Sequence, residues 1–152
     1  MFAKRPLVFG LGYDSPVYLT VNNNTMFVES NAAWIEKMKL PCKDCVVHYV
    51  FETSGPNDMI LEDVDIPPIS EPRLEHAFDF ILIDGPPGTT PGRFQPIKFA
   101  RQRVRDGTLR YVCVHDANRV VEKALFLRYF GDPHDVLSTG FSRQQLACKR
   151  FP

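Results

Sequence analysis

Three short apolar runs, each ending in glycines or in acidic and histidine residues, constrain the fold more than any other feature. They cover residues 7–12, 80–85 and 111–116. Buried parallel strands read as continuous hydrophobic runs, and each of these segments has the length of such a strand. Ligands of open α/β sheets bind just beyond the carboxyl ends of the parallel strands. We therefore expect the polar ends of the three runs to line one shared crevice.

Helical segments alternate with the strands along the chain, which is typical of a parallel sheet with helices on both faces. Two segments near the C-terminus, 135–139 and 145–150, are so close in sequence that they can pair only as an antiparallel hairpin. Five parallel strands followed by such a hairpin predict a Rossmann-like α/β fold of the class I methyltransferase type, with a seven-stranded, mostly parallel sheet. The expected strands are 7–10, 25–29, 45–51, 78–84 and 111–115, and the expected helices start at Ser15-Pro16 and at Ser30 or Asn31, lie near 59–61, and cover 93–105 and 120–130.

The composition fits a globular chain and argues against some partner classes. With 152 residues, 44% of them hydrophobic, the chain is expected to form one domain over residues 1–152. Its formal net charge is zero, which argues against binding nucleic acid by phosphate neutralisation. No run approaches the roughly twenty apolar residues of a membrane span, and the first residues lack a signal-peptide pattern. We therefore expect a soluble cytoplasmic or other intracellular protein, or a Golgi one if an anchor lies outside this chain. The sequence does not indicate the oligomeric state.

The four cysteines do not form an evident metal site. Cys42 and Cys45 form a C-x-x-C pair, but a structural zinc site normally needs four ligands and no second cluster lies near in sequence. We interpret the two as a reduced pair in a loop. Cys113 lies inside an expected strand, where a free cysteine behaves as a small hydrophobic residue. Cys148 is expected in a strand as well.

A glycine turn after the first strand indicates the kind of cofactor. Gly10 and Gly12 begin like the dinucleotide motif G-x-G-x-x-G, but Ser15 stands where the third glycine belongs, which counts against NAD. S-adenosylmethionine has no phosphate, so a bare backbone turn is enough beneath its methionine part. Glu29 ends the second strand, where a carboxylate can accept hydrogen bonds from both ribose hydroxyls, unless it is an ordinary surface acid. The expected cofactor-binding residues are Gly10, Gly12, Asp14, Ser15, Glu29 and Asp84.

Asp84, His115 and Asp116 follow two neighbouring strands and are the expected catalytic residues, although a strand-end aspartate can also be a helix cap. Methyl transfer to a hydroxyl requires that the acceptor oxygen be aligned with the methyl group and that its proton be removed. A divalent metal (Mg²⁺, Mn²⁺ or Co²⁺) would lower the pKa of the hydroxyl. Asp84 and Asp116 offer the hard oxygen ligands that such ions prefer, and His115 is either a further ligand or the base.

At these residues the chain resembles the plant glucuronoxylan 4-O-methyltransferase family, whose domain is also called a polysaccharide-biosynthesis domain. The resemblance implies S-adenosylmethionine as the donor, a carbohydrate hydroxyl as the acceptor, and help from a divalent metal. By position it also implies that Arg93 faces the acceptor, where its guanidinium suits a carboxylate such as that of glucuronate. The alternative for Arg93 is packing at the start of its helix. The segments that carry the resemblance are residues 8–15, 27–29, 33–35, 83–86, 91–93, 114–116, 118–122 and 151–152.

The chain also departs from the plant pattern. We expect it to lack the membrane anchor and stem of the plant members, and Thr89 and Thr90 stand where the plant pattern has aromatic and acidic residues. We therefore expect a glycan sugar other than xylan as the acceptor. Two alternatives stay open: methylation of a small hydroxyl compound such as a catechol, and a non-catalytic scaffold of the same fold. The intact set of glycines, acids and histidine argues against the scaffold.

Overall fold

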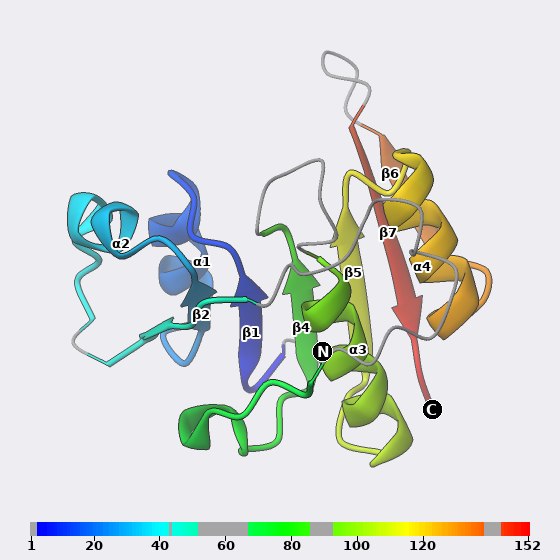
Figure 1. Cartoon of the computed structure of the whole chain (residues 1–152), viewed down its shortest axis with the longest axis horizontal. Helices are drawn as coiled ribbons and strands as arrows, with labels where there is room; N and C mark the ends of the chain where they lie inside the picture. The colour runs from blue at the N-terminus through cyan, green and yellow to red at the C-terminus, as the bar shows by residue number, and fades with distance from the viewer. Residues whose placement is uncertain (1–2, 43, 52–66, 86–92, 139–143) are drawn as a thin grey trace.

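The computed structural model describes residues 3–42, 44–51, 67–85, 93–138 and 144–152. Within these residues one seven-stranded sheet runs through the molecule in the order β3-β2-β1-β4-β5-β7-β6 (Figure 1). The strands are β1 Pro6–Phe9, β2 Met26–Glu29, β3 Val46–His48, β4 Phe80–Ile83, β5 Tyr111–His115, β6 Asp135–Ser138 and β7 Gln145–Arg150. The helices are α1 Ser15–Val21, α2 Ala32–Met38, α3 Phe94–Arg105 and α4 Val120–Phe130, and η2 Pro72–Leu74 is a short 3₁₀ turn.

The topology confirms the predicted fold class. Strands β1 to β5 pair in parallel, whereas β7 pairs antiparallel with both β5 and β6. Phe9 is aligned with Val28 of β2 and with Ile83 of β4, and Ile83 is aligned with Val114 of β5. This register brings the carboxyl ends of four parallel strands to one edge of the sheet. The residues that follow the strands therefore meet there, as predicted.

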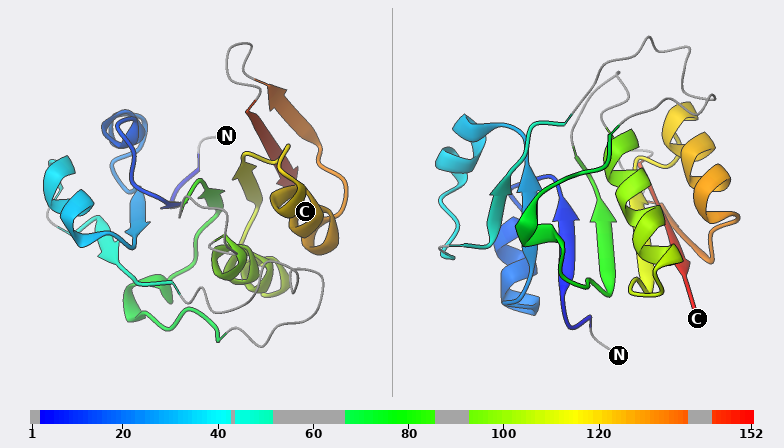
Figure 2. Two further views of the ribbon diagram at one scale, coloured as in Figure 1. Left: turned by 45° about the horizontal axis from the view of Figure 1, so that its top comes forward. Right: turned by 60° about the horizontal axis from the view of Figure 1, so that its bottom comes forward.

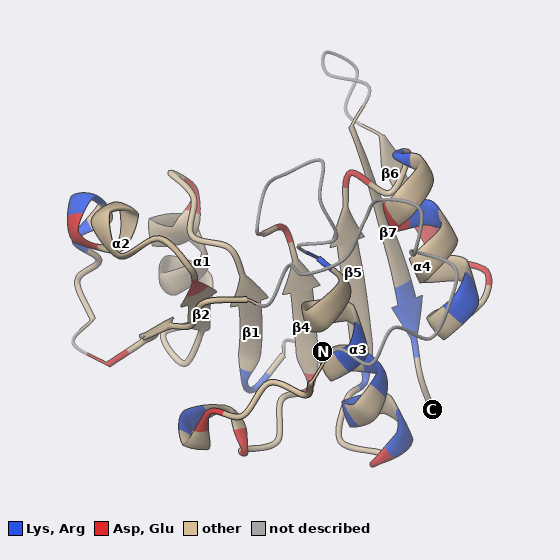
Figure 3. Ribbon diagram, viewed as in Figure 1, with Lys and Arg blue, Asp and Glu red and all other residues tan. Residues whose placement is uncertain are grey.

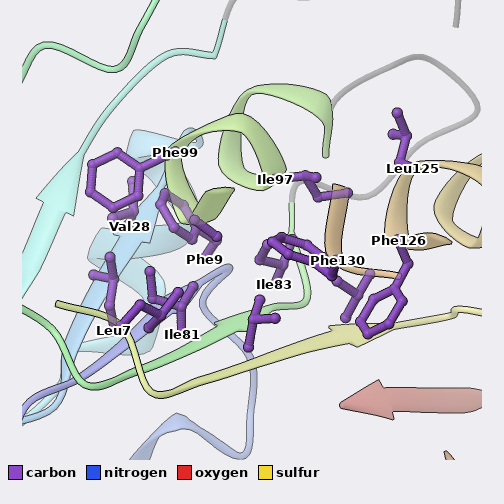
Figure 4. Packing of buried hydrophobic residues seen from close by; sticks show 14 of the residues in the cluster. Leu7, Phe9, Val28, Ile81, Ile83, Ile97, Phe99, Leu125, Phe126 and Phe130 are labelled. Atoms are coloured by element: carbon purple, nitrogen blue, oxygen red, sulfur yellow. The ribbon is translucent and has the colours of Figure 1, made fainter. Parts of the chain in front are cut away.

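Alternating side chains divide the core between the two faces of the sheet. Figure 2 shows α3 and α4 on one face and α1 and α2 on the other. Leu7, Phe9, Ile81 and Ile83 are fully buried, and they pack in one cluster with residues of α3 and α4, including Ile97 (Figure 4). The intervening residues of the same strands belong to a second cluster on the α1–α2 face. Both faces of the central strands are apolar, which explains their continuous hydrophobic runs.

The helix starts follow the sequence signals with one difference. Asn31 caps α2, and its side-chain oxygen accepts a hydrogen bond from the backbone N–H of Trp34 at 3.1 Å. Helix α1 starts at Ser15, as expected, but Asp14 occupies the cap position and makes no side-chain cap bond. Ser15 is instead fully buried, and its hydroxyl accepts from the N–H of Gly12 at 3.0 Å. The serine therefore stabilises the preceding glycine turn rather than the helix.

The structure corrects the expectation of reduced cysteines. Cys42 is bonded to Cys45, and Cys113 is bonded to Cys148, so every cysteine of the chain is paired. The second bond follows from the strand register, because Cys113 of β5 is directly opposite Cys148 of β7. Sequence spacing gave no sign of this pairing, since the two residues are 35 positions apart.

Some predicted features lie outside the described residues. The short helix expected near 59–61 and the Thr89-Thr90 segment are among them. The third strand was expected over 45–51, but β3 is limited to Val46–His48. Among the described residues, no helix has the length and apolar character needed to cross a membrane.

Candidate functional site

Two polar side chains meet at the ends of neighbouring strands. His115 ends β5, and its Nδ1 lies 2.9 Å from Oδ1 of Asp84, the first residue after β4. This contact does not have the geometry of a hydrogen bond, and catalytic hydrogen bonds are often long or poorly aligned until a substrate binds. The side chains of Asp84 and His115 are 38% and 27% exposed, so both reach the solvent at the carboxyl edge of the sheet. This pair, named the His115–Asp84 pair below, is the accessible part of the site.

The third expected residue, Asp116, lies behind this pair rather than beside it. Its side chain is only 7% exposed, and its Oδ2 is 3.6 Å from Nδ1 of His115. Asp116 has a positive φ of 57°, which a non-glycine residue adopts at a cost that its contacts must offset. Those contacts are ionic: Oδ2 lies 3.1 Å from a nitrogen of Arg93 and 3.0 Å from one of Arg119. Figure 3 shows acidic segments at the ends of β4 and β5 with a basic segment between them.

Arg93 is buried beneath the pair. Its side chain is 6% exposed, and its two terminal nitrogens donate to the backbone carbonyls of His115, at 2.6 Å, and of Asp84, at 2.9 Å. The same nitrogens approach carboxylates of Asp116 at 3.1 Å and of Glu122 at 3.5 Å. Both terminal nitrogens of Arg93 are thus engaged by carbonyls and carboxylates of the protein itself. The geometry therefore favours the packing alternative over the acceptor contact that the resemblance implied.

Two residues of the ion-pair network around Arg93 and Asp116 were not identified from the sequence. Glu122 lies in the first turn of α4 and is 5% exposed, yet an acid there reads as an ordinary partner of the helix dipole. Arg119 is half-exposed and occupies the cap position of α4, where a cation is unfavourable near the positive end of the dipole. The unfavourable placement of Arg119 was the signal that could have drawn attention to it.

Burial shifts the protonation of the accessible carboxylate. The pKa of Asp84 is raised, chiefly because burial disfavours the charged form, and the charges of Asp14 and Asp116 act in the same direction. The charge interactions of Asp84 with His115 and Arg93 act in the opposite direction and offset part of this rise in pKa. Burial together with Asp14 also raises the pKa of Tyr18 to about 12. An acid with a raised pKa at a strand end is typical of functional sites.

The glycine turn after β1 is bonded directly to the end of β4. The backbone N–H groups of Asp84 and Gly85 both donate to the carbonyl of Phe9, at 2.9 and 2.7 Å. Gly10 has φ of +106°, and a Cβ added to it would lie 2.8 Å from the nitrogen of Gly85. A Cβ at Gly85 would likewise lie 2.7 Å from Cα of Gly10. Two backbones can approach this closely only where both residues are glycine.

The acid at the end of β2 holds the same turn. Glu29 is buried; its Oε2 accepts from the N–H of Leu11 at 3.0 Å and its Oε1 from the N–H of Asn31 at 2.8 Å. The indole N–H of Trp34 donates to the carbonyl of Leu11. Glu29 and Ser15 thus hold the turn that contains Gly10 and Gly12, by accepting from the backbone N–H groups of Leu11 and Gly12. Of the expected cofactor residues, the glycines, Asp14, Glu29 and Asp84 come to one edge, whereas Ser15 lies under the turn.

The predicted metal pair does not fit the charges around it. Oδ2 of Asp116 already lies within 3.1 Å of two guanidinium groups, and Oδ1 of Asp84 is 3.6 Å from one of them. A divalent ion bound to these oxygens at roughly 2.1 Å would stand beside two fixed cations in a partly buried site. Within the described residues, no group of three or more His, Cys, Asp or Glu side chains could hold a metal ion. We derive no step through a metal.

A large cavity lies far from these groups. An apolar cavity of about 830 Å³ opens at the amino edge of the sheet, on the α1 face. Its lining includes Val17 and Tyr18 of α1, Phe80 of β4 and Tyr111 of β5. It contains neither member of the His115–Asp84 pair. The polar side chains described above therefore lie at the opposite edge of the sheet from this cavity.

Comparisons with known proteins place the chain beside plant O-methyltransferases. Glucuronoxylan 4-O-methyltransferase 2 of Arabidopsis thaliana is 33% identical over 145 residues, which cover 76% of this chain and 50% of that protein. Arabinogalactan O-methyltransferase 2 of the same plant is 30% identical over 167 residues, covering 88% of this chain and 57% of that protein. These matches confirm the resemblance found in the sequence: the chain is related to the glucuronoxylan 4-O-methyltransferase family. It spans about half the length of the curated relatives that it matches.

Two other comparisons add less. No family model matches the chain. Among solved structures, a human methyltransferase 10 domain containing protein aligns over 97% of this chain and 72% of its own, with 15% identity and a TM-score of 0.44.

Proposed function

We propose that this chain is a methyltransferase domain that transfers the methyl group of S-adenosylmethionine to a hydroxyl of a glycan sugar, with His115 as the general base. The observation that carries the proposal is the His115–Asp84 pair, which reaches solvent at the strand edge directly beside the Gly10 turn. The names of the relatives, which act on glucuronoxylan and arabinogalactan, support a glycan acceptor over a small catechol.

The turn and the acid behind it are suited to the donor. In this proposal a small sulfonium compound lies against the turn that contains Gly10 and Gly12, and because it has no phosphate, no third glycine is needed. Bound there, S-adenosylmethionine supplies an electrophilic methyl group. Oε1 of Glu29 accepts from the N–H of Asn31 and the hydroxyl of Ser30, whereas Oε2, among the described residues, accepts only from the N–H of Leu11, which leaves a lone pair for a ribose hydroxyl.

The His115–Asp84 pair performs the proton transfer in this proposal. With Nδ1 facing the carboxylate at 2.9 Å, the proton of the neutral imidazole is favoured on Nδ1, and Nε2 is left as an acceptor. The acceptor hydroxyl gives its proton to Nε2 as its oxygen forms a bond to the methyl carbon and the sulfur–methyl bond breaks. Asp84 then faces an imidazolium and stabilises its charge. Positioned bases of this kind contribute about 10² to 10⁴ in rate.

Donor binding and methyl transfer test the proposal separately. Calorimetry with S-adenosylmethionine is expected to show binding to the wild-type chain. Transfer of labelled methyl should then be found with an oligosaccharide from a panel that bears glucuronic acid, xylose, rhamnose or arabinogalactan units, and not with catechol. Absence of donor binding would contradict the proposal and favour the scaffold alternative.

The matched variant pair is His115→Gln and His76→Gln. His76 is exposed beside η2, away from the strand edge, so its replacement is expected to change nothing. His115→Gln should bind the donor as well as wild type does, with turnover lower by about 10² to 10⁴. Wild-type turnover in His115→Gln would remove the histidine from the mechanism.

A further inference from the structure

The guanidinium of Arg93 joins the two residues of the proposed catalytic pair through their backbones. One terminal nitrogen donates to the carbonyl of His115 and the other to the carbonyl of Asp84, at 2.6 and 2.9 Å. These carbonyls belong to the ends of two adjacent strands, β5 and β4. A planar group with fixed nitrogen positions therefore sets how far apart the two strand ends lie.

A carboxylate accompanies each carbonyl. The nitrogen that bonds His115 lies 3.5 Å from Oε1 of Glu122, and the nitrogen that bonds Asp84 lies 3.1 Å from Oδ2 of Asp116. Glu122 comes from α4, whereas Arg93 directly precedes α3. The side chains of Glu122 and Arg93 are nearly excluded from solvent, at 7% and 6% exposure. A buried charge that loses its partner is costly, so each of the two holds the other in place.

We infer that Arg93 and Glu122 are positioning residues for methyl transfer: Glu122 fixes the orientation of the Arg93 guanidinium, and the guanidinium fixes the separation of His115 and Asp84. The inference rests on the proposed function, because it assigns these residues to the same catalytic pair. Neither residue touches the acceptor or the donor. Their effect on the reaction passes through geometry, and a displacement of about 1 Å of a reacting group can cost on the order of 10² in rate.

A purely structural role would give a different result. If the Arg93–Glu122 contact only attached α4 to the sheet, its loss would lower the thermal midpoint and leave the turnover of the folded protein unchanged. A positioning role instead predicts a lower kcat at temperatures where the variant is fully folded, with the donor dissociation constant retained. The two readouts are measured on the same protein samples by calorimetry and labelled methyl transfer.

The first variants change Glu122 and a control glutamate. Glu122→Gln keeps the shape and removes the charge, and it is expected to lower kcat about 10- to 100-fold, in keeping with a modest displacement of the pair. Glu36→Gln changes an exposed glutamate of α2 and should behave as wild type. Glu122→Asp keeps the charge and should recover part of the lost kcat. A folded Glu122→Gln protein with wild-type kcat would overturn the inference.

A double-mutant cycle with Arg93→Lys tests whether the two residues act through one contact. Lysine keeps the positive charge but cannot donate to both carbonyls from fixed positions, so its kcat should fall as well. If both residues act through the same bridge, adding Glu122→Gln to Arg93→Lys should lower kcat little further. Fully additive losses would overturn the inference. Should Arg93→Lys fail to fold, the Glu122→Gln and Glu122→Asp comparison decides it alone. Failure of the proposed function is distinguishable, because the wild type itself would then transfer no methyl.

Discussion

A methyl group at Gly10 should damage the site far more than a methyl group at another glycine of positive φ. In Gly10→Ala the new Cβ meets the nitrogen of Gly85 at 2.8 Å and its Cα at 3.0 Å, contacts shorter than backbone tolerates. The φ of +106° adds strain of about 1 to 3 kcal/mol for a residue with a side chain. Relief of the overlap by backbone shifts adds a further ~1 to 3 kcal/mol.

Gly107 offers the matched control. Its φ is +69°, and a Cβ there would meet nothing within 4 Å, so Gly107→Ala carries the conformational cost without the overlap. That cost is about 1 to 2 kcal/mol for a left-handed residue. In a chain of this size each kcal/mol lowers the thermal midpoint by roughly 2 to 4 °C. The difference between the two variants measures the crowding between the ends of β1 and β4.

The assay combines thermal unfolding with donor calorimetry and methyl transfer. Gly10→Ala should unfold at a lower temperature than Gly107→Ala, and it alone should lose donor binding and turnover. The overlap displaces Gly85 and with it Asp84, which shares the carbonyl of Phe9 as a hydrogen-bond acceptor. Equal stability of the two variants, or normal donor binding by folded Gly10→Ala, would refute the close approach of the two backbones.

The Cys113–Cys148 disulfide and the partly buried Asp84 give two further predictions. Loss of the Cys113–Cys148 bond, which closes a 35-residue separation, should lower the free energy of unfolding by about 4 kcal/mol in the chain-entropy model. The measurement is urea unfolding of the Cys113→Ala/Cys148→Ala variant with and without reductant. A wild-type protein whose stability does not change in reductant would show that the thiols are free. Because the folded-state pKa of Asp84 is raised, the fold favours its protonated form, and this stabilisation is present in acid and lost as pH rises through the folded pKa. Asp84→Asn should therefore have a higher thermal midpoint than wild type at neutral pH, with a difference that shrinks towards pH 4, and a constant difference would contradict the raised pKa.

Local patterns were enough to predict the strands and helices that carry the site. The strand Tyr111–His115 and the helix Val120–Phe130 occur with the expected bounds, because a continuous apolar run and a glycine stop are strong local signals. The hairpin of β6 and β7 followed from chain connectivity alone. Convergence of Asp84 with His115 then followed from parallel pairing, since the ends of neighbouring strands must lie at one edge.

Features that depend on side-chain packing between distant elements could not be predicted in the same way. The sequence shows Arg93 as a cation at a helix start, and only the structure brings the carboxylates of Asp84, Asp116 and Glu122 around it. Both terminal nitrogens of Arg93 contact carbonyls and carboxylates, and its Nε is buried, so the guanidinium is not free to turn towards an acceptor carboxylate. The resemblance gives the position and type of the residue, whereas its contacts are set by where the guanidinium points.

The backbone bonds at the strand edge couple the glycine turn to the proposed catalytic pair. The carbonyl of Phe9 accepts from the N–H of Asp84, and the N–H of Gly10 donates to the carbonyl of Val28 at 2.8 Å. One continuous set of backbone bonds therefore joins β2, the glycine turn and the acid that faces His115. Because methyl transfer requires the donor methyl and the base to be aligned on one acceptor oxygen, this rigid link makes the alignment a property of the sheet itself. Arg93 supplies the corresponding link on the β5 side, because it donates to the carbonyls of both His115 and Asp84. The glycine turn and His115 are therefore each held to the end of β4.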